Sequence, residues 1–371
     1  MDCLATSAPE SRPPYTALLA GHDTLVCGYY LRAEPASDID WTRLLGKREE
    51  LRVSSSRDPA VVVLGDAEFL LQPYGSASGY PIVLTGPHYK IECGEFNRPS
   101  FYVTFRSEAL WRDSAAGVHD RFLAWAASAG LVIERPEVVS RVDWAFDYHL
   151  PSLDFDESHF VSVAAKDSKH REGGRIQTLT FGRGDIVLRV YDKIAEIEQQ
   201  SHKTWLLELW GGVCEDVWRI EWQARKALLR QFGIRTFESL RERQADVLCN
   251  LASEHTTLRV PNGDSNRSRW ALHPLWQDLQ RRIDDMESLG AQRSDTLASA
   301  LDERLMRSLI GVYGYLKRIA AIHVLQQARH DVVPLALLLP ELRLQLQRIH
   351  DPLAWDSDVR KRIDEMRLGP W

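Results

Sequence analysis

The sequence predicts an α+β protein: a domain built on a largely antiparallel sheet with helices on one face, followed by a helical C-terminal region. Short apolar runs bounded by Gly, Pro, Asn and Ser recur from residue 25 to residue 105 and again from 138 to 224, which is typical of strands. Beyond about residue 270 the apolar residues recur at helical spacing instead.

The first half of the chain is mostly strand-like. The runs that predict strands are Leu25–Leu31, Val61–Leu64, Phe69–Leu71 and Phe101–Phe105. A helix is expected between the first two runs, because Asp38 or Asp40 can cap it and the apolar residues that follow have helical spacing. A second helix is expected at Val118–Ala129, where Gly130 ends it.

Three further strands are predicted in the middle of the chain, at Val138–His149, Ile176–Tyr191 and Val217–Ala224. The segment after Tyr191 is expected to be helical and to stop at Gly211 and Gly212. Lys166–Gly174 is predicted to be an exposed and mostly basic loop.

These patterns predict four parts: a flexible segment at 1–20, a domain at 21–260, a polar linker at 261–269 and a helical region at 270–371. In the last part the apolar residues follow a coiled-coil rhythm for about two heptads, at Leu305, Leu309, Val312, Leu316 and Ile319. A zipper normally needs three or four heptads, so the pattern favours an amphipathic helix in a small bundle over a homodimer zipper.

Composition places the chain among ordinary soluble proteins. Of its 371 residues 44% are hydrophobic and 26% charged, and its net charge of −6 does not favour a nucleic-acid partner. Five scattered cysteines without a Cys-x-x-Cys pair argue against a zinc site or a disulfide framework. Since we find no signal peptide and no apolar run long enough to span a bilayer, we expect a cytoplasmic protein that does not engage a membrane.

The most informative feature is the alternation of side chains in the three middle strands. Residues two apart in a strand share a face, so each of these strands has one apolar and one polar face. The polar faces carry Arg141, Asp143, Asp147, Arg189, Tyr191, Arg219, Glu221 and Gln223. If the strands are neighbours in one sheet, these side chains form a single patch. The alternative is a solvated sheet face laced with cross-strand ion pairs.

The residue types in this patch suit chemistry on a phosphodiester. Carboxylates on a rigid sheet can hold Mg²⁺ or Mn²⁺, and arginines bind phosphate oxygens. A tyrosine hydroxyl becomes a nucleophile when a base takes its proton or a cation lowers its pKa. Lys193, just past Tyr191, could stabilise the phenolate or the departing oxygen.

Three blocks in this region resemble a known family. The run from Phe181 to Lys193, which ends in Arg-Val-Tyr-Asp-Lys, is similar to the active-site block of the rolling-circle replication initiators of plasmids and filamentous phages. The runs Arg-Val-Asp-Trp-Ala-Phe-Asp at 141–147 and Arg-Ile-Glu at 219–221 resemble the flanking blocks in type and order. The resemblance extends over about residues 23–276, and no His-x-His metal motif accompanies it.

The resemblance implies a metal-dependent, site-specific endonuclease and strand transferase that nicks one strand of double-stranded origin DNA. Tyr191 would become joined to the 5′-phosphate and leave a 3′-OH primer, with Lys193 and Arg189 assisting. Asp143, Glu221 and Asp147 would hold Mg²⁺ or Mn²⁺, while the residues that contact DNA phosphates would be Arg141, Arg219, Lys166, Lys169 and Arg171.

Two other functions remain open at this point. A mobilisation or conjugation relaxase of the same fold would use identical chemistry, and a replication regulator could bind DNA without cutting it. For the C-terminal helices, dimerisation, origin binding and recruitment of a host helicase are equally open.

Overall fold

The structure is a computed structural model that describes residues 15–54, 58–286, 297–327 and 332–368. The chain divides into two compact units, Met1–Ser294 and Asp295–Trp371. This boundary lies beyond the predicted linker at 261–269. The linker residues join β13 (Thr256–Val260) to β14 (Ala271–Leu272), which pair with each other, and α7 (Pro274–Asp284) follows in the same unit.

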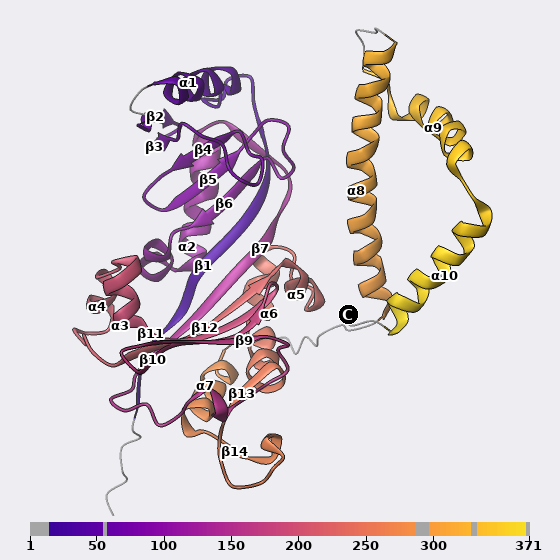
Figure 1. Ribbon diagram of the computed structural model, residues 1–371. Helices are drawn as coiled ribbons and strands as arrows, with labels where there is room; N and C mark the ends of the chain where they lie inside the picture. Colours follow the sequence, from indigo (N-terminus) through magenta and orange to yellow (C-terminus); the bar gives the residue numbers. More distant parts are fainter. Residues whose placement is uncertain (1–14, 55–57, 287–296, 328–331, 369–371) are drawn as a thin grey trace, which may run out of the picture. The chain divides into compact units, whose positions relative to one another are not determined.

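The first unit is built on one sheet of eleven strands in which every neighbouring pair is antiparallel (Figure 1). The strand order is β2-β3-β4-β5-β6-β1-β7-β12-β11-β10-β9. The bounds in chain order are β1 Thr16–Ala33, β2 Ala60–Leu64, β3 Ala67–Leu71, β4 Ile82–Thr85, β5 Tyr89–Cys93, β6 Phe101–Phe105, β7 Leu131–His149, β9 Asp167–Glu172, β10 Arg175–Arg183, β11 Ile186–Asp192 and β12 Val217–Arg225. The prediction of a largely antiparallel sheet is confirmed.

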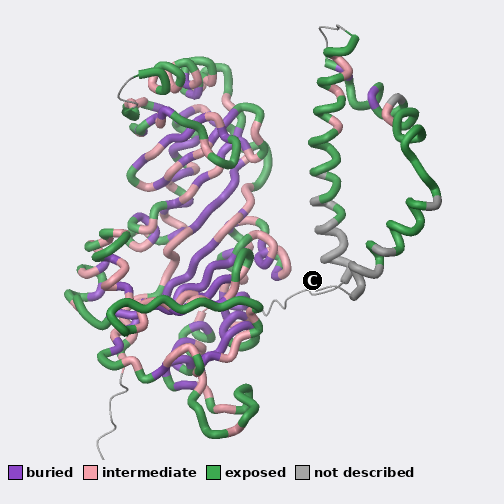
Figure 2. The backbone as a smooth tube through the Cα atoms, viewed as in Figure 1, coloured by how far each residue is buried: buried purple, intermediate pink, exposed green. Residues whose placement is uncertain are grey.

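Two long strands form the middle of the sheet. β1 and β7 pair from Thr16 opposite His149 to Ala33 opposite Leu131, so both extend well beyond the runs that predicted them. The pairing contains several register shifts, one of which leaves Asp23 as an extra residue between His22 and Thr24. Such a bulge bends a strand and re-aims a side chain. Figure 2 shows buried residues along part of each of these strands and exposed residues along β9.

The region predicted as a basic loop at 166–174 is instead the edge strand β9 and its turn. β9 pairs with β10, and β10 returns through a tight turn to β11, so Ile176–Tyr191 forms two strands rather than one. All six residues of β9 are exposed, and its polar sequence lacks the alternation that identifies a strand.

Helices cover the apolar face of the β7–β12–β11 region. Trp276 of α7 contacts Trp222 of β12, and Trp144 of β7 donates a hydrogen bond to Gln244 of α6. Elsewhere α2 packs through residues such as Phe122 against the aromatic side chains of β1, β5 and β6. The bounds are α1 Trp41–Val53, α2 Ser107–Ser128, α5 Lys226–Gln231 and α6 Phe237–Asn250, with a small sheet of β8 (Phe160–Ser162), β13 and β14 beside them.

The segment after Tyr191 is helical, as predicted, but it is broken into pieces. α3 (Lys193–Glu196) continues into a π-helical turn at Ile197–Ser201, and α4 (Trp205–Leu209) follows. This segment forms a second apolar cluster with Val217, a residue on the polar face of β12. One end of the polar face is therefore covered by α3, the π turn and α4.

In its described residues the C-terminal unit contains three helices: α8 (Leu297–Gln326), α9 (Leu335–Ile349) and α10 (Pro352–Leu368). The helical C-terminal region is thus confirmed. Several residues of the predicted seam on α8, among them Leu305, Leu309 and Val312, are exposed. The homodimer stays a prediction.

Candidate functional site

The polar side chains predicted to form a patch do lie on adjacent strands. β12 stands between β7 and β11 and pairs with both. Arg219 lies opposite Asp147 on one side and Tyr191 on the other, while Glu221 lies opposite Arg189. Opposite residues in an antiparallel pair share a face, so these side chains are brought together by register alone.

Tyr191 and Glu221 form the centre of the site. The Tyr191 hydroxyl donates a hydrogen bond of 2.8 Å to Oε2 of Glu221, and Arg189 Nη1 donates one of 3.0 Å to Oε1. Tyr191 is only 8% exposed. Burial, reinforced by the Glu221 charge, raises the pKa of Tyr191 well above its usual value. Burial and the charge of Asp23 likewise raise the pKa of Glu221, which makes this carboxylate a better base.

A buried ion cluster lies directly beside this pair. Arg219 donates to both oxygens of Asp147, at 2.6 and 2.8 Å, and a third bond of 2.6 Å runs to Asp23. Trp210 of the segment after α4 donates a further bond of 3.0 Å to Asp147. Both Arg219 and Asp147 are 0% exposed. As placed here, Arg219 orients acids rather than facing DNA, and Asp147 has both oxygens occupied by protein donors.

Asp23 is the site residue that sequence reasoning missed. The bulge in β1 turns its carboxylate toward Arg219, and Ser107, Trp111 and Lys203 also donate to it. Although burial acts to raise the pKa of Asp23, the charges of Arg219 and Lys203 hold it well below its usual value. The sequence shows only a polar residue just before an apolar run, which does not indicate a bulge.

Arg141 and Asp143 pair with each other two residues apart on β7. Arg141 Nε donates to Asp143 at 2.8 Å, and Nη2 donates to its other oxygen. Asp143 is buried, whereas the Arg141 side chain is 32% exposed. Arg141 and Arg189, whose side chain is 33% exposed, are the predicted arginines of this face that a ligand can reach.

Lys193 is buried beneath the tyrosine. Its ammonium lies 5.5 Å from the centre of the Tyr191 ring and donates to Glu196. Burial, together with the nearby charge of Arg219, lowers the pKa of Lys193. This lysine is close enough to the tyrosine to act on charge that develops there.

The basic residues of β9 do not join this site. Lys169 lies opposite Leu179, and Arg171 opposite Ile176, whereas the Tyr191 face of β10 carries Thr178. Lys169 and Arg171 both form ion pairs with Glu157 instead. The alternation places His170 rather than Lys169 or Arg171 on the tyrosine side, and Lys166 is exposed before the strand begins.

The carboxylates as arranged do not fit a divalent-cation site. Each oxygen of Asp23, Asp143, Asp147 and Glu221 already accepts a hydrogen bond from a protein donor. The nearby arginines and lysines also balance their charge. Within the described ranges of the chain, no group of three or more His, Cys, Asp or Glu residues is placed to hold a metal ion. The ligand set of Asp143, Glu221 and Asp147 for Mg²⁺ or Mn²⁺ therefore stays a prediction, and no step below depends on it.

A cavity of about 390 Å³ opens beside Tyr191 and Glu221. Its floor is the polar face of the sheet, with Arg141 and Arg189, and one wall is formed by α3 and the π turn. The side chains that complete the lining are His170, Gln177, Thr178, Thr180, Asp192, Ala195, Glu196, Gln199 and Gln200. The site therefore combines a tyrosine, a carboxylate base and two reachable arginines around a polar cavity.

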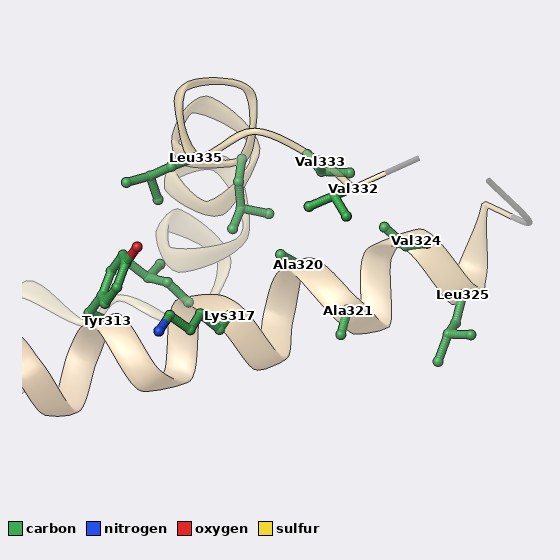
Figure 3. A pocket seen from close by; sticks show the side chains of 11 residues that line it. Tyr313, Lys317, Ala320, Ala321, Val324, Leu325, Val332, Val333 and Leu335 are labelled. Carbon is green, nitrogen blue, oxygen red and sulfur yellow. The ribbon is translucent and has the colours of Figure 1, made fainter. Parts of the chain in front are cut away.

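The C-terminal unit contains a different cavity, of about 560 Å³, between α8 and the start of α9 (Figure 3). Its lining is almost wholly apolar, with Leu316, Val324, Val333 and Leu338 among the residues and Lys317 at one side. Apart from Tyr313 and Lys317, the residues that line this cavity carry no side-chain group suited to acid–base or phosphate chemistry.

Comparison with known proteins gives a likeness to solved structures. No protein-family model matches the chain, and no curated protein matches it. Among solved structures, the chain is similar to a rolling circle replication initiator protein from Geobacillus stearothermophilus, with 16% sequence identity and a TM-score of 0.44. The match covers 72% of this chain and 97% of the other. In the described part of the chain, we find no helix that is both long and apolar enough to span a membrane.

Proposed function

We propose that the protein is a tyrosine-dependent DNA strand transferase that nicks one strand at a replication origin and so initiates rolling-circle replication. The observation that carries this proposal is the hydrogen bond from the Tyr191 hydroxyl to Glu221 at the edge of a cavity with two reachable arginines. The resemblance of the three sequence blocks to the rolling-circle initiators supports the same assignment.

In the proposed reaction the Tyr191 oxygen attacks the phosphorus of a phosphodiester while Glu221 takes the phenolic proton. The 2.8 Å separation lies within the range required of a general base. The bond between phosphorus and the 3′-oxygen breaks, so that the 5′-phosphate is joined to Tyr191. The departing 3′-oxygen takes a proton from water and leaves as a 3′-OH. Because burial raises the pKa of Tyr191, its hydroxyl is protonated before the reaction, and a base is needed to take the proton.

The cationic side chains of the site would have two kinds of role: some would contact the phosphate, and others would stabilise or position the reacting groups. Arg189 and Arg141 are exposed to the cavity and would bind the phosphate oxygens on which charge develops. Lys193 would stabilise the charge on the tyrosine or the departing oxygen. Arg219 acts indirectly, since it holds the buried carboxylates in place.

The direct test is formation of a covalent adduct. Purified protein is incubated with supercoiled DNA of the replicon that encodes it, in Mg²⁺, in Mn²⁺ and in EDTA, and then denatured with detergent. We expect nicked DNA with protein attached to its 5′ end, and we expect Tyr191→Phe to form none. The matched control is Tyr148→Phe, because Tyr148 on β7 is also buried but its hydroxyl bonds to Asp278.

An active Tyr191→Phe variant would remove Tyr191 as the nucleophile. Wild-type protein that binds this DNA but forms no adduct under any of the three conditions would instead identify a regulator that does not cut. The EDTA arm decides separately whether a divalent cation is needed.

A further inference from the structure

The cavity beside Tyr191 has a wall of amide side chains that the proposed chemistry does not use. Gln177 and Gln199 both donate to Oε2 of Glu172, at 2.7 and 2.8 Å. One carboxylate oxygen at the tip of the β9–β10 hairpin thus holds two glutamines from separate elements. Because a carboxylate only accepts, each glutamine directs an N–H toward it and keeps its carbonyl oxygen and a second N–H for another partner.

Both glutamines are placed by irregular backbone. A register shift in the pairing of β9 with β10 leaves Gln177 as the extra residue of a bulge. Gln199 and Gln200 lie on the π-helical turn that follows α3. Bulges and π turns are found disproportionately at functional sites, where they re-aim side chains. Here both irregularities deliver amides to one cavity that also contains Arg141 and Arg189.

We propose that this cavity holds one unpaired nucleotide of the DNA strand, next to the phosphate that Tyr191 attacks, and that the glutamines select its base. The inference rests on the proposed function and names a specificity element for it. An amide presents a donor and an acceptor side by side, the pattern that reads base edges. The volume of about 390 Å³ lies at the small end of the range for small-molecule sites, which leaves room for one nucleotide.

The nucleotide must be unpaired for two reasons. The cavity of about 390 Å³ has room for one nucleotide and not for a base pair, and recognition by hydrogen bonds to a whole base edge requires a base that is not paired. Arg141 and Arg189 on the cavity floor would bind the phosphate that Tyr191 attacks, while the base of the adjoining nucleotide extends toward the glutamines.

The test measures base preference without cleavage. In the Tyr191→Phe background, fluorescence anisotropy gives the affinity for labelled dA, dC, dG and dT homo-oligonucleotides of about 12 nucleotides. We expect the tightest and the weakest to differ about tenfold, and the double change Gln177→Ala and Gln199→Ala to reduce that ratio below about threefold. The control Gln277→Ala changes an exposed glutamine on α7, across the sheet, and should leave the ratio unchanged.

Two results would overturn the inference: a base preference below about threefold before any glutamine is changed, or a preference that survives the double change. A third arm uses the four deoxynucleoside 5′-monophosphates as competitors. If a mononucleotide binds more tightly than the matching oligonucleotide, the cavity serves a free nucleotide and not a DNA strand. Adduct formation is scored separately with Tyr191 intact, so failure of the chemistry and failure of base selection give different results.

Discussion

The change Asp147→Asn tests whether this aspartate belongs to the buried ion cluster, as its contacts show, or to a metal site, as the sequence predicted. The carboxylate accepts two bonds from Arg219 and one from Trp210, and neither Asp147 nor Arg219 is exposed. Asparagine keeps the shape but offers one acceptor and places an NH₂ group against a donor. Arg219 would then lack half of its charge compensation.

The cost in free energy of unfolding follows from the buried ion pair that is lost. Removing one partner of a buried ion pair destabilises a protein by about 3–5 kcal/mol. Asp23 still accepts a 2.6 Å bond from Arg219 in the variant, so the loss should lie at the lower end of that range, at about 3 kcal/mol. For a typical urea dependence this corresponds to a midpoint lowered by about 1 M.

The assay is urea unfolding followed by tryptophan fluorescence, because Trp144, Trp222 and Trp276 are fully buried in the first unit. The control is Glu134→Gln, which removes an exposed pair with Arg32 and should cost less than about 1 kcal/mol. A loss below 1 kcal/mol for Asp147→Asn would refute the structural role. The structural role would also be refuted if Mn²⁺ raised the urea midpoint of the wild type but not that of Asp147→Asn, because Asp147 would then be a metal ligand.

Three further outcomes can be measured on the same unit. Gly182→Ala should lower the midpoint of urea unfolding more than Gly184→Ala. Both glycines have positive φ, but only a Cβ at Gly182 would overlap the Ile186 carbonyl, so equal losses in the two variants would contradict this reasoning. Burial lowers the pKa of His22 to about 4, so protons bind the unfolded chain before they bind the folded one. The free energy of unfolding should therefore fall by about 2 kcal/mol between pH 7.5 and pH 5. This fall should be smaller in His22→Gln, and a variant with the same pH dependence as the wild type would refute the assignment. Arg189→Gln should slow adduct formation about 100-fold, whereas the control Arg183→Gln, which changes an exposed arginine of the β10–β11 hairpin, should not slow it. A rate for Arg189→Gln within about threefold of the wild-type rate would exclude Arg189 from the phosphate site.

The alternation of residues predicted the floor of the site because it depends only on local geometry. Every second residue of a strand faces the same way, so the sequence placed the polar residues of β7, β11 and β12 on one face of each strand. The pairing of the three strands brings Tyr191, Arg219 and Glu221 together. It also predicted the antiparallel sheet and the helical C-terminal region. The same reliance on local pattern explains why residues 166–174 were wrongly predicted to form a loop. The charged residues of β9 have no apolar face that would indicate a strand.

The rest of the site depends on contacts between distant segments, which alternation does not reveal. Asp23 reaches Arg219 across 196 positions of sequence through a bulge, and Trp210 reaches Asp147 from the segment after α4, whose position against the sheet no periodicity predicts. Those contacts decide which polar residues are buried partners and which can meet a ligand. Arg219 and Arg189 have the same residue type and the same face, yet only Arg189 is exposed to the cavity.

This pairing of charges also predicts how binding responds to salt. The arginines of the polar face are matched by Asp143, Asp147 and Glu221, in keeping with the net charge of −6, so the face offers DNA no surplus positive charge. If Arg141 and Arg189 together neutralise the one phosphate that Tyr191 attacks, the logarithm of the affinity for single-stranded DNA should fall with the logarithm of the salt concentration with a slope of about −0.7. Anisotropy titrations of the Tyr191→Phe protein from low to physiological salt give that slope. A value steeper than about −4 would mean that at least five or six phosphates are neutralised, and DNA would then have to bind over a basic surface outside this cavity.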